Sequence, residues 1–345
     1  AEEKEDIVCV DQLGPVIRRS DDMSPEALYH ALGKPDVITV EKEHVDVPLL
    51  SALQAFCTVH PNPKALEKFK NRHAEKRFLQ SLAIPIAPYK PVRTEADLLA
   101  ALDALAAPVF LKTEEEGYDG YNQYKISDDN RDHVLAEIRY PGKWVAEQGI
   151  PFEREVSFIA ARATNGDIVY YPPAENNHQQ GTLLTSLIPA PNLPEAIVAQ
   201  GQKYLCAMLT ELNYVGVMCV ECFVWGDQLL VNEIAPRVHN SGHWTSKGAL
   251  TSQFENHVRA VAGLALGGTD ARGVCGMLNL LGVTLDAEHA CNAGSFLTLY
   301  GKSVRPRRKL GHVTVVADSY DVVAKRLEVL RVQAYEGEQN GDAVS

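Results

Sequence analysis

Two glutamates, Glu221 and Glu233, lie twelve residues apart on either side of a turn signal, Gly226-Asp227. The apolar runs that flank this signal predict the two strands of a β-hairpin. With a three-residue connection, 226–228, the two carboxylates face each other; with a two-residue connection, Glu221 lies opposite Asn232 instead. Facing carboxylates repel each other unless a cation lies between them, and Mg²⁺ prefers oxygen ligands, including nucleotide phosphates. The first register therefore predicts a magnesium site, and the sequence permits both.

The segment after the second predicted strand, 232–245, is the densest polar cluster, with one acid, one arginine, two histidines and two asparagines. A surface loop rich in turn formers is one interpretation of it. The other is a functional loop, in which Arg237 offers paired donors to an oxyanion. An arginine that merely pairs with a nearby acid such as Glu221 is the competing interpretation of that residue.

A lysine followed by a glycine-bearing loop forms a second candidate. Lys112 ends the apolar run 109–112, and the loop that follows carries Gly117 and Gly120. Glycines let backbone N–H groups approach a phosphate closely. Most lysines at strand ends are simply solvated, so this pattern alone indicates little.

The third candidate is Glu147-Gln148-Gly149-Ile150, followed by Glu155. A strand end next to a glycine offers backbone groups to an adenine, and a carboxylate accepts hydrogen bonds from ribose hydroxyls. This pattern is also weak by itself. The order of all these features along the chain is more informative than any one of them.

In this order the residues resemble the ATP-grasp ligases, and 217–266 resembles the N5-carboxyaminoimidazole ribonucleotide synthetases of de novo purine synthesis. The resemblance rests above all on the run Asn232-Glu-Ile-Ala-Pro-Arg-Val-His-Asn-Ser-Gly-His-Trp-Thr245. Shorter matches extend it over residues 36–335: Asp36-Val-Ile-Thr-Val-Glu41, Lys112-Thr113, Gly117-Tyr-Asp-Gly120, Glu147-Gln-Gly149, Glu155-Val156, Asn177-His178, Ser252-Gln-Phe-Glu255, Leu299-Tyr-Gly-Lys302 and Arg308-Lys-Leu-Gly-His312.

The resemblance implies an ATP-dependent carboxylation of 5-aminoimidazole ribonucleotide. In the family, bicarbonate attacks the γ-phosphate of ATP to give carboxyphosphate, the aminoimidazole amine captures the carboxyl group, and ADP and phosphate leave. The implied cofactors are ATP and Mg²⁺, since cations must neutralise the charge around the γ-phosphate. The implied partners are these small molecules and a second copy of the chain in a homodimer.

The resemblance also assigns roles to individual residues. Glu221 and Glu233 correspond to the metal ligands, and the catalytic contacts to bicarbonate and carboxyphosphate correspond to Arg237 and Asn240. The residues implied to bind ATP are Arg72, Lys112, Gly117, Tyr118, Asp119, Gly120, Gln123, Glu147, Gln148, Gly149, Ile150, Glu155, His178, Asn232 and Glu233. Tyr118 and Asp119 are also implied to be catalytic, as contacts to the aminoimidazole. The phosphate of the ribonucleotide is implied to contact Lys302, Arg308 and Lys309.

Two regions depart from the family pattern. Only Asp11-Gln-Leu-Gly14 remains of an opening glycine-rich motif, and dozens of residues are missing between Arg19 and Asp36. This predicts a reduced N-terminal sheet of about three or four strands and weak ribonucleotide binding. Glu114-Glu115-Glu116 occupies the loop after Lys112, where three acids beside a triphosphate are electrostatically adverse. The alternatives are therefore a weakened or inactive nucleotide-binding relative and another ATP-grasp carboxylate–amine ligase.

The elements that must position these residues indicate an α/β protein. We expect a shortened N-terminal α/β domain over 1–70, an ATP-grasp domain over 71–263 and a small β-rich domain over 264–345. Helices are predicted from Ser24 and from Thr94 and at 63–82, 194–212, 252–261 and 321–332. Besides the hairpin, strands are predicted at 7–10, 36–40, 109–112, 144–147, 155–162, 168–171, 295–300 and 312–316.

Composition narrows the classes of partner. The chain has 345 residues and a formal net charge of −12, which argues against binding to nucleic acid or an anionic membrane. No targeting or membrane-spanning pattern is visible, so a cytoplasmic protein is expected. The seven cysteines favour reduced thiols, and the single CxxC pair, Cys219 and Cys222, is interpreted as two buried apolar side chains rather than as a zinc site.

Overall fold

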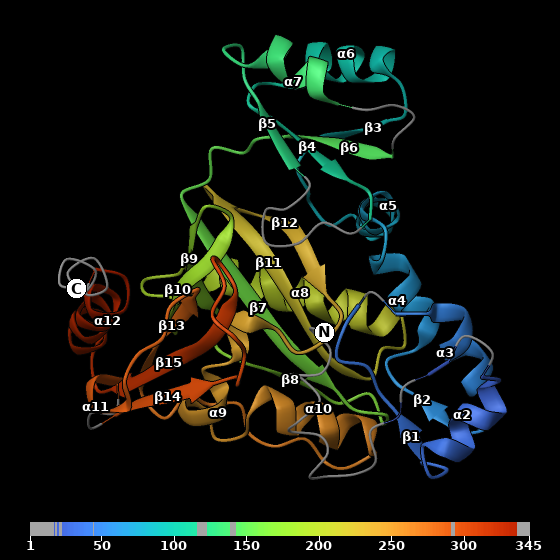
Figure 1. Cartoon of the computed structure of the whole chain (residues 1–345), viewed down its shortest axis with the longest axis vertical. Helices are drawn as coiled ribbons and strands as arrows, with labels where there is room; N and C mark the ends of the chain where they lie inside the picture. Colours follow the sequence, from blue (N-terminus) through green and yellow to red (C-terminus); the bar gives the residue numbers. More distant parts are fainter. Residues whose placement is uncertain are drawn as a thin grey trace.

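The computed structural model describes residues 17, 19–20, 23–43, 45–115, 123–138, 143–290 and 294–336. Three β-sheets organise this part of the chain: a two-stranded sheet, a four-stranded sheet and a nine-stranded sheet (Figure 1). The mixture of helices and sheets confirms the α/β class. Among the described residues, no helix is both long enough and apolar enough to cross a membrane.

The N-terminal part, blue in Figure 1, contains only short elements. They are α2 (Pro25–Ala31), β1 (Val37–Ile38), α3 (Val47–Leu53), β2 (Thr58–Val59) and α4 (Pro63–Phe69), with β1 and β2 paired in parallel. Helix α2 begins as predicted, because the Ser24 side chain accepts a hydrogen bond from the N–H of Ala27. The strand predicted at 7–10 lies outside the described residues, so the size of the N-terminal sheet stays a prediction.

The four-stranded sheet lies at the top of Figure 1 and carries two helices on its outer face. Its strands, in the order β3-β6-β4-β5, are β3 (Tyr89–Val92), β6 (Trp144–Gln148), β4 (Val109–Thr113) and β5 (Gln123–Ile126), and its helices are α6 (Glu95–Ala104) and α7 (Arg131–Glu137). The predicted start at Thr94 is confirmed by a capping box, in which Thr94 and Asp97 exchange side-chain-to-backbone hydrogen bonds. Lys112 and Glu147 lie on neighbouring strands of this sheet.

The nine-stranded sheet forms the body of the molecule (Figure 1). Its path runs β12 (Gln228–Ala235), β11 (Gly216–Trp225), β7 (Arg154–Arg162), β9 (Ala174–Gln179), β10 (Thr182–Ile188), β13 (Val274–Leu281), β15 (Lys309–Ala317) and β14 (Ser295–Leu299), with β8 (Ile168–Tyr170) paired to β7. The remaining elements are α8 (Glu195–Glu211), η1 (Asn240–Gly242), α9 (Thr245–Gly248), α10 (Gln253–Val261), α11 (Ala287–Ala290) and α12 (Tyr320–Tyr335). Strand β13 pairs with β10, so the C-terminal strands continue the sheet of the preceding region.

The structure adds local detail that was not predicted. The helical stretch predicted at 63–82 is two helices, α4 and α5 (Arg72–Ser81), because the Asn71 side chain caps α5 by accepting a hydrogen bond from the N–H of Ala74. Several strands were not predicted, and β9 is the clearest case, since Ala174–Gln179 is polar and lacks alternation. That segment is a strand because β7 and β10 pair with it on both sides.

The two cysteines of the CxxC pair belong to different parts of the core. Cys219 is fully buried in one apolar cluster with Val217 and Trp244, whereas Cys222 is buried in another with Val220 and Val224. This placement agrees with their interpretation as small apolar side chains.

Candidate active site

A cavity of about 2350 Å³ lies between the four-stranded sheet, the β11–β12 hairpin and the segment 300–309. The predicted site residues that line it are Arg72, Lys112, Gln123, Glu147, Gln148, Gly149, Ile150, Glu155, His178, Glu221, Asn232, Glu233, Arg237, Asn240, Lys302, Arg308 and Lys309. Gly117, Tyr118, Asp119 and Gly120 lie outside the described residues. Side chains from distant parts of the sequence therefore meet at one cavity.

The hairpin places its two glutamates opposite each other by an unpredicted route. Trp225 pairs with Gln228, so the connection has two residues. The expectation that the two glutamates face each other only with a three-residue connection was therefore wrong. The register shifts between Glu221 and the next residue, which leaves Asn232 as the extra residue of a β-bulge and pairs Glu221 with Glu233. The bulge therefore produces the facing carboxylates that the turn length alone would have excluded.

The surroundings of Glu221 favour its neutral form. Burial and the neighbouring carboxylates of Glu233 and Glu155 raise the pKa of Glu221 to about 7, although His178 acts against this shift. On the other strand, Oε2 of Glu233 lies 3.9 Å from Nη1 of Arg72. A divalent cation between Glu221 and Glu233 would remove the repulsion between them.

Two histidines flank the same oxygen of Glu221. Nε2 of His239 lies 3.7 Å and Nε2 of His178 lies 4.0 Å from Oε1 of Glu221. Nδ1 of His178 contacts Oε2 of Glu155 at 2.8 Å, and Nδ1 of His239 accepts a hydrogen bond from the N–H of Ser241 at 3.2 Å. An accepting Nδ1 leaves the proton of neutral His239 on Nε2, the atom nearer to Glu221.

Lys112 is held at the cavity wall by a buried carboxylate. Oε2 of Glu147 lies 3.0 Å from Nζ of Lys112, and Oε1 lies 3.2 Å from Nζ of Lys76. Burial would raise the pKa of Glu147, but the charges of Lys112, Lys76 and Arg72 outweigh it and lower this pKa to about 2. Glu147 is thus an ionised buried group with cations on both sides. Lys76 was not predicted, and its only signal in the sequence is a charge between apolar helical positions.

The backbone after β6 turns close to a neighbouring segment. A Cβ at Gly149 would lie 2.7 Å from the carbonyl oxygen of Pro108, so a side chain does not fit there. The N–H of Gly149 donates to this oxygen at 2.7 Å, and the side chain of Gln148 accepts from the N–H of Ala106 at 3.1 Å. These bonds fix the wall of the cavity between Glu147 and Ile150.

The acid that pairs with Arg237 is Glu43, from the N-terminal part, and not Glu221 as considered from the sequence. Nε and Nη2 of Arg237 donate to the two carboxylate oxygens of Glu43, and Nη1 donates to the carbonyl of Val238 at 3.0 Å. Three residues further on, the amide atoms of Asn240 are buried and have no hydrogen-bond partner within the described residues. An unsatisfied buried amide beside a fixed guanidinium suits an oxyanion ligand.

The triple glutamate does not form one acidic face. Glu114 is 3% exposed, and its carboxylate accepts hydrogen bonds from Arg93 and from Asn71. Glu115 lines the cavity, and Glu116 lies outside the described residues. The prediction that all three acids oppose the triphosphate was therefore wrong for Glu114, whose role is structural.

The segment 302–309 makes one end of the cavity lining basic, and Lys302, Arg308 and Lys309 belong to it. Their contact with a phosphate stays a prediction. Nη1 of Arg308 donates to the hydroxyl of Ser303 at 2.8 Å, and Nζ of Lys302 lies 5.7 Å from the ring centroid of Tyr300. Among the further lining residues that were not singled out from the sequence are Glu43, His239, His243 and Tyr300.

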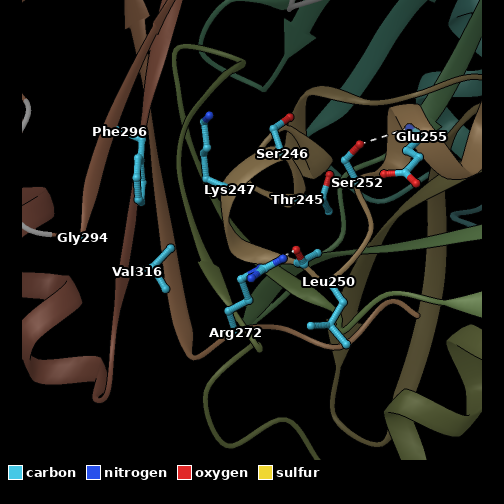
Figure 2. A pocket seen from close by; sticks show the side chains of 11 residues that line it. Thr245, Ser246, Lys247, Leu250, Ser252, Glu255, Arg272, Gly294, Phe296 and Val316 are labelled. Carbon is cyan, nitrogen blue, oxygen red and sulfur yellow. Dashed lines mark hydrogen bonds between the residues drawn. The ribbon is translucent and has the colours of Figure 1, made fainter. Parts of the chain in front are cut away.

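A second cavity, of about 570 Å³, lies elsewhere, between α9, the start of α10 and β14 (Figure 2). Lys247 and Arg272 are its basic residues, and Nζ of Lys247 lies 5.9 Å from the ring centroid of Phe296. None of the predicted site residues lines it. It therefore offers a lysine outside the candidate active site for control experiments.

Comparison with protein families identifies two regions of the chain. Residues 77–254 match the ATP-grasp domain, and residues 275–326 match the phosphoribosylaminoimidazole carboxylase C-terminal domain. The chain is 40% identical over 309 residues to an N5-carboxyaminoimidazole ribonucleotide synthase of Vibrio cholerae, which covers 87% of this chain and 81% of the relative. It is 43% identical over 299 residues to the Brucella melitensis enzyme of the same name, with 84% and 82% coverage.

Solved structures give the same result. The N5-carboxyaminoimidazole ribonucleotide synthetase of Thermus thermophilus superposes with a TM-score of 0.86 at 38% identity, over 94% of this chain and 88% of that one. The N5-carboxyaminoimidazole synthase of Aspergillus clavatus, in complex with ADP and 5-aminoimidazole ribonucleotide, superposes with a TM-score of 0.80 at 26% identity, over 91% and 85%.

Proposed function

Because the chain belongs to the N5-carboxyaminoimidazole ribonucleotide synthase family of ATP-grasp ligases, we propose that it carboxylates 5-aminoimidazole ribonucleotide with bicarbonate and ATP, in purine biosynthesis. The products are N5-carboxyaminoimidazole ribonucleotide, ADP and phosphate. The observation that supports this most is one cavity that joins a lysine–glutamate cluster, a pair of facing glutamates and a basic end. These features suit, in turn, a nucleotide, a metal-bound triphosphate and a phosphorylated substrate.

The metal we propose is Mg²⁺, held by Glu221 and Glu233. Their carboxylates are the hard oxygen donors that this ion prefers, and their repulsion is relieved by a cation. No group of three or more metal-binding side chains occurs in the described part of the chain, so the nucleotide phosphates and water would complete the ligand set. When bound, Mg²⁺ neutralises charge on the phosphates.

The nucleotide is proposed to lie across the junction of the two larger sheets. The backbone from Glu147 to Ile150 would contact the adenine, and Glu155 the ribose, since carboxylates accept from ribose hydroxyls. Lys112 contacts Glu147 at this wall, lines the cavity and is proposed to contact the phosphates. Its pairing with Glu147 holds the ammonium in place before ATP binds.

Arg237 and Asn240 are proposed to hold bicarbonate next to the γ-phosphate. A guanidinium whose orientation is fixed by Glu43 and Val238 places its remaining N–H groups in one direction. The Asn240 amide offers both a donor and an acceptor. Lys302, Arg308 and Lys309 are proposed to hold the ribonucleotide phosphate at the other end of the cavity.

The decisive experiment measures ADP release with each substrate omitted in turn. The proposed function requires that ADP forms only when 5-aminoimidazole ribonucleotide, bicarbonate and Mg²⁺ are all present, and that labelled bicarbonate enters the product. ADP release that needs another carboxylate or amine would identify a different ATP-grasp ligase. ATP binding without turnover would identify an inactive relative.

A pair of lysine variants tests the site itself. Lys302→Ala should raise the KM for the ribonucleotide about tenfold, the loss typical of a charged hydrogen bond. Lys247→Ala removes a lysine at the second cavity and should leave this KM unchanged. Equal effects of the two variants would argue against ribonucleotide binding at the basic end.

We further propose a homodimer in the cytoplasm. Closed twofold symmetry is the commonest state of soluble oligomers. The described cysteines, at 57, 206, 219, 222 and 275, are free thiols, as in a reducing compartment. Light scattering at several protein concentrations tests the oligomeric state.

A further inference from the structure

Three rings from separate elements are joined by hydrogen bonds at the edge of the cavity. Nδ1 of His243 lies 3.0 Å from the hydroxyl of Tyr300, and the same hydroxyl lies 2.8 Å from Nδ1 of His312. His243 follows η1, Tyr300 follows β14, and His312 belongs to β15. His243 and Tyr300 line the cavity, whereas His312 is 4% exposed behind them.

The number of protons restricts how this triad is arranged. The hydroxyl of Tyr300 has one proton and donates to only one of the two Nδ1 atoms, so the other histidine must donate its own proton to the hydroxyl oxygen. Nε2 of His312 is buried and has no hydrogen-bond partner within the described residues. A proton on that atom would be a buried, unpaired N–H donor, which proteins avoid more strictly than an unpaired acceptor. His312 therefore carries its proton on Nδ1.

The remaining protons follow from this choice. His312 donates from Nδ1 to Tyr300, and Tyr300 donates its hydroxyl proton to Nδ1 of His243. His243 must then carry its proton on Nε2, which has no partner in the described part of the chain. Burial, together with the positive charges of Lys309 and Arg237, lowers the pKa of His243 to about 3, and burial lowers that of His312 to about 4. Both histidines are neutral at physiological pH, as the arrangement requires.

We propose that His243 donates a hydrogen bond from Nε2 to an oxygen atom of the ribonucleotide, and that Tyr300 and His312 are positioning residues that keep the proton on that atom. The inference rests on the proposed function. The cavity wall supports it, because Lys302 lies against the ring of Tyr300 and Lys309 is close enough to act on His243. An N–H donor beside two cations suits the oxygens of a phosphorylated ligand.

Enzyme kinetics test the contact to the substrate. His243→Leu should raise the KM for 5-aminoimidazole ribonucleotide about tenfold while the KM for ATP changes less than about twofold, as for one lost hydrogen bond. His243→Gln, whose amide N–H reaches a position similar to Nε2, should restore part of the affinity. Tyr300→Phe should raise the KM about threefold.

A matched variant controls for the loss of a buried hydroxyl. The hydroxyl of Tyr335 donates to the carbonyl of Asn279 at 2.7 Å and does not line the cavity, so Tyr335→Phe should leave the KM unchanged. Thermal unfolding of each variant separates local effects from global destabilisation. An unchanged ribonucleotide KM in a folded, active His243→Leu variant would overturn the contact.

Nitrogen-15 NMR of histidine-labelled protein tests the positions of the protons. The expected spectrum shows the proton of His243 on Nε2 and that of His312 on Nδ1, and Tyr300→Phe should abolish this fixed pattern. The reverse pattern in the wild type would overturn the arrangement. If the wild-type protein does not use the ribonucleotide, the proposed function is overturned, and so is the proposed ligand of His243. The NMR result would still decide the proton positions in the triad.

Discussion

Glu147 shows how single charged residues are kept inside this protein. Lys112 and Lys76 contact its two oxygens, so the cost of burying the carboxylate is offset by two cations. Arg237 and Glu43 form a similar pair in the lining of the same cavity. At this scale, function depends on which ion pair each charged side chain forms before a ligand binds.

The first prediction concerns the geometry of Arg237. Arg237→Lys keeps the charge but loses the planar pair of donors, so turnover should fall by about a hundredfold while ATP affinity changes little. Bicarbonate-dependent ADP formation and ATP binding are the measurements. The control is Arg259→Lys, on an exposed ion pair of α10, which should change neither. Normal turnover of Arg237→Lys, or loss of ATP binding in step with activity, would show that Arg237 is no bicarbonate clamp.

The second prediction concerns Glu75, a 5% exposed carboxyl whose pKa is raised from 4.5 to about 8 by burial and by the charge of Glu233. The folded state therefore retains a proton that the unfolded state loses above about pH 4.5, and Glu75 makes stability fall as pH rises toward 8. Glu75→Gln removes this loss. As pH rises over this range, the free energy of unfolding of Glu75→Gln minus that of the wild type should increase by up to about 1.4 kcal/mol per pH unit.

Urea unfolding of both proteins between about pH 5 and pH 8 checks this dependence. Glu95→Gln, at an exposed position of α6, is the matched control for a surface carboxylate. A constant difference between Glu75→Gln and wild type across this range would contradict the assignment of a protonated Glu75.

At the scale of elements, the β11–β12 hairpin separates what the sequence predicts from what it does not. The apolar runs and Gly226-Asp227 predict both strands and their turn. They do not predict the bulge at Asn232, because a bulge depends on how the whole hairpin packs rather than on a local signal: β11 pairs with β7, and apolar residues of both strands share one core cluster with α8. The facing glutamates were thus one of two permitted arrangements until the register was known.

The third prediction follows from this bulge. Insertion of one glycine between Gly226 and Asp227 lengthens the turn but leaves the paired segment near Glu221 intact, so kcat and the KM for ATP should stay within about twofold of wild type. The measurement is steady-state kinetics of the insertion variant. A large loss of Mg²⁺-dependent activity, in a variant that still folds, would show that the turn and not the bulge sets the register.

The fourth prediction separates two neighbouring acids in the segment after β4. Glu114→Ala removes the buried partner of Arg93 and should lower the free energy of unfolding by about 1–3 kcal/mol without changing ATP affinity. Glu115→Arg, at the cavity wall, should tighten ATP binding, and more so at low ionic strength. ATP titrations at two salt concentrations and urea unfolding distinguish them. Unchanged ATP affinity of Glu115→Arg at low salt would place this residue away from the phosphates.

At the scale of the whole molecule, the sequence motif predicted the family, the ATP-grasp fold and part of the cavity lining, but not Glu43, His239, His243 or Tyr300. Composition and periodicity alone did not bring these residues together, since Glu43, Arg72, Lys112 and Lys302 come from distant segments. Their meeting depends on how the sheets lie against each other, which no local pattern encodes. The polar strand β9 was missed for the same reason, because its partners on both sides make it a strand.

The fifth prediction concerns the shortened N-terminal region. The resemblance implies that family residues are missing between Arg19 and Asp36, and such a loss should weaken ribonucleotide binding to a KM above about 1 mM. Steady-state kinetics with varied ribonucleotide and saturating ATP and bicarbonate give this value. A KM in the ordinary range of about 1 μM–1 mM would show that the shortened region is no handicap.

The order of strands in the large sheet has a consequence for biosynthesis of the chain on the ribosome. β10 is made well before β13, its partner on one side, and that edge stays open until residues 274–281 emerge. At translation rates of about 5–20 residues per second, the nascent chain exposes this edge for roughly ten seconds. Before β13 is made, the backbone groups of Thr185–Ile188 on this edge are unpaired, so a half-made chain presents a template on which another nascent strand can pair. Slower translation between β10 and β13 should therefore lower the yield of soluble protein more than slower translation after β14.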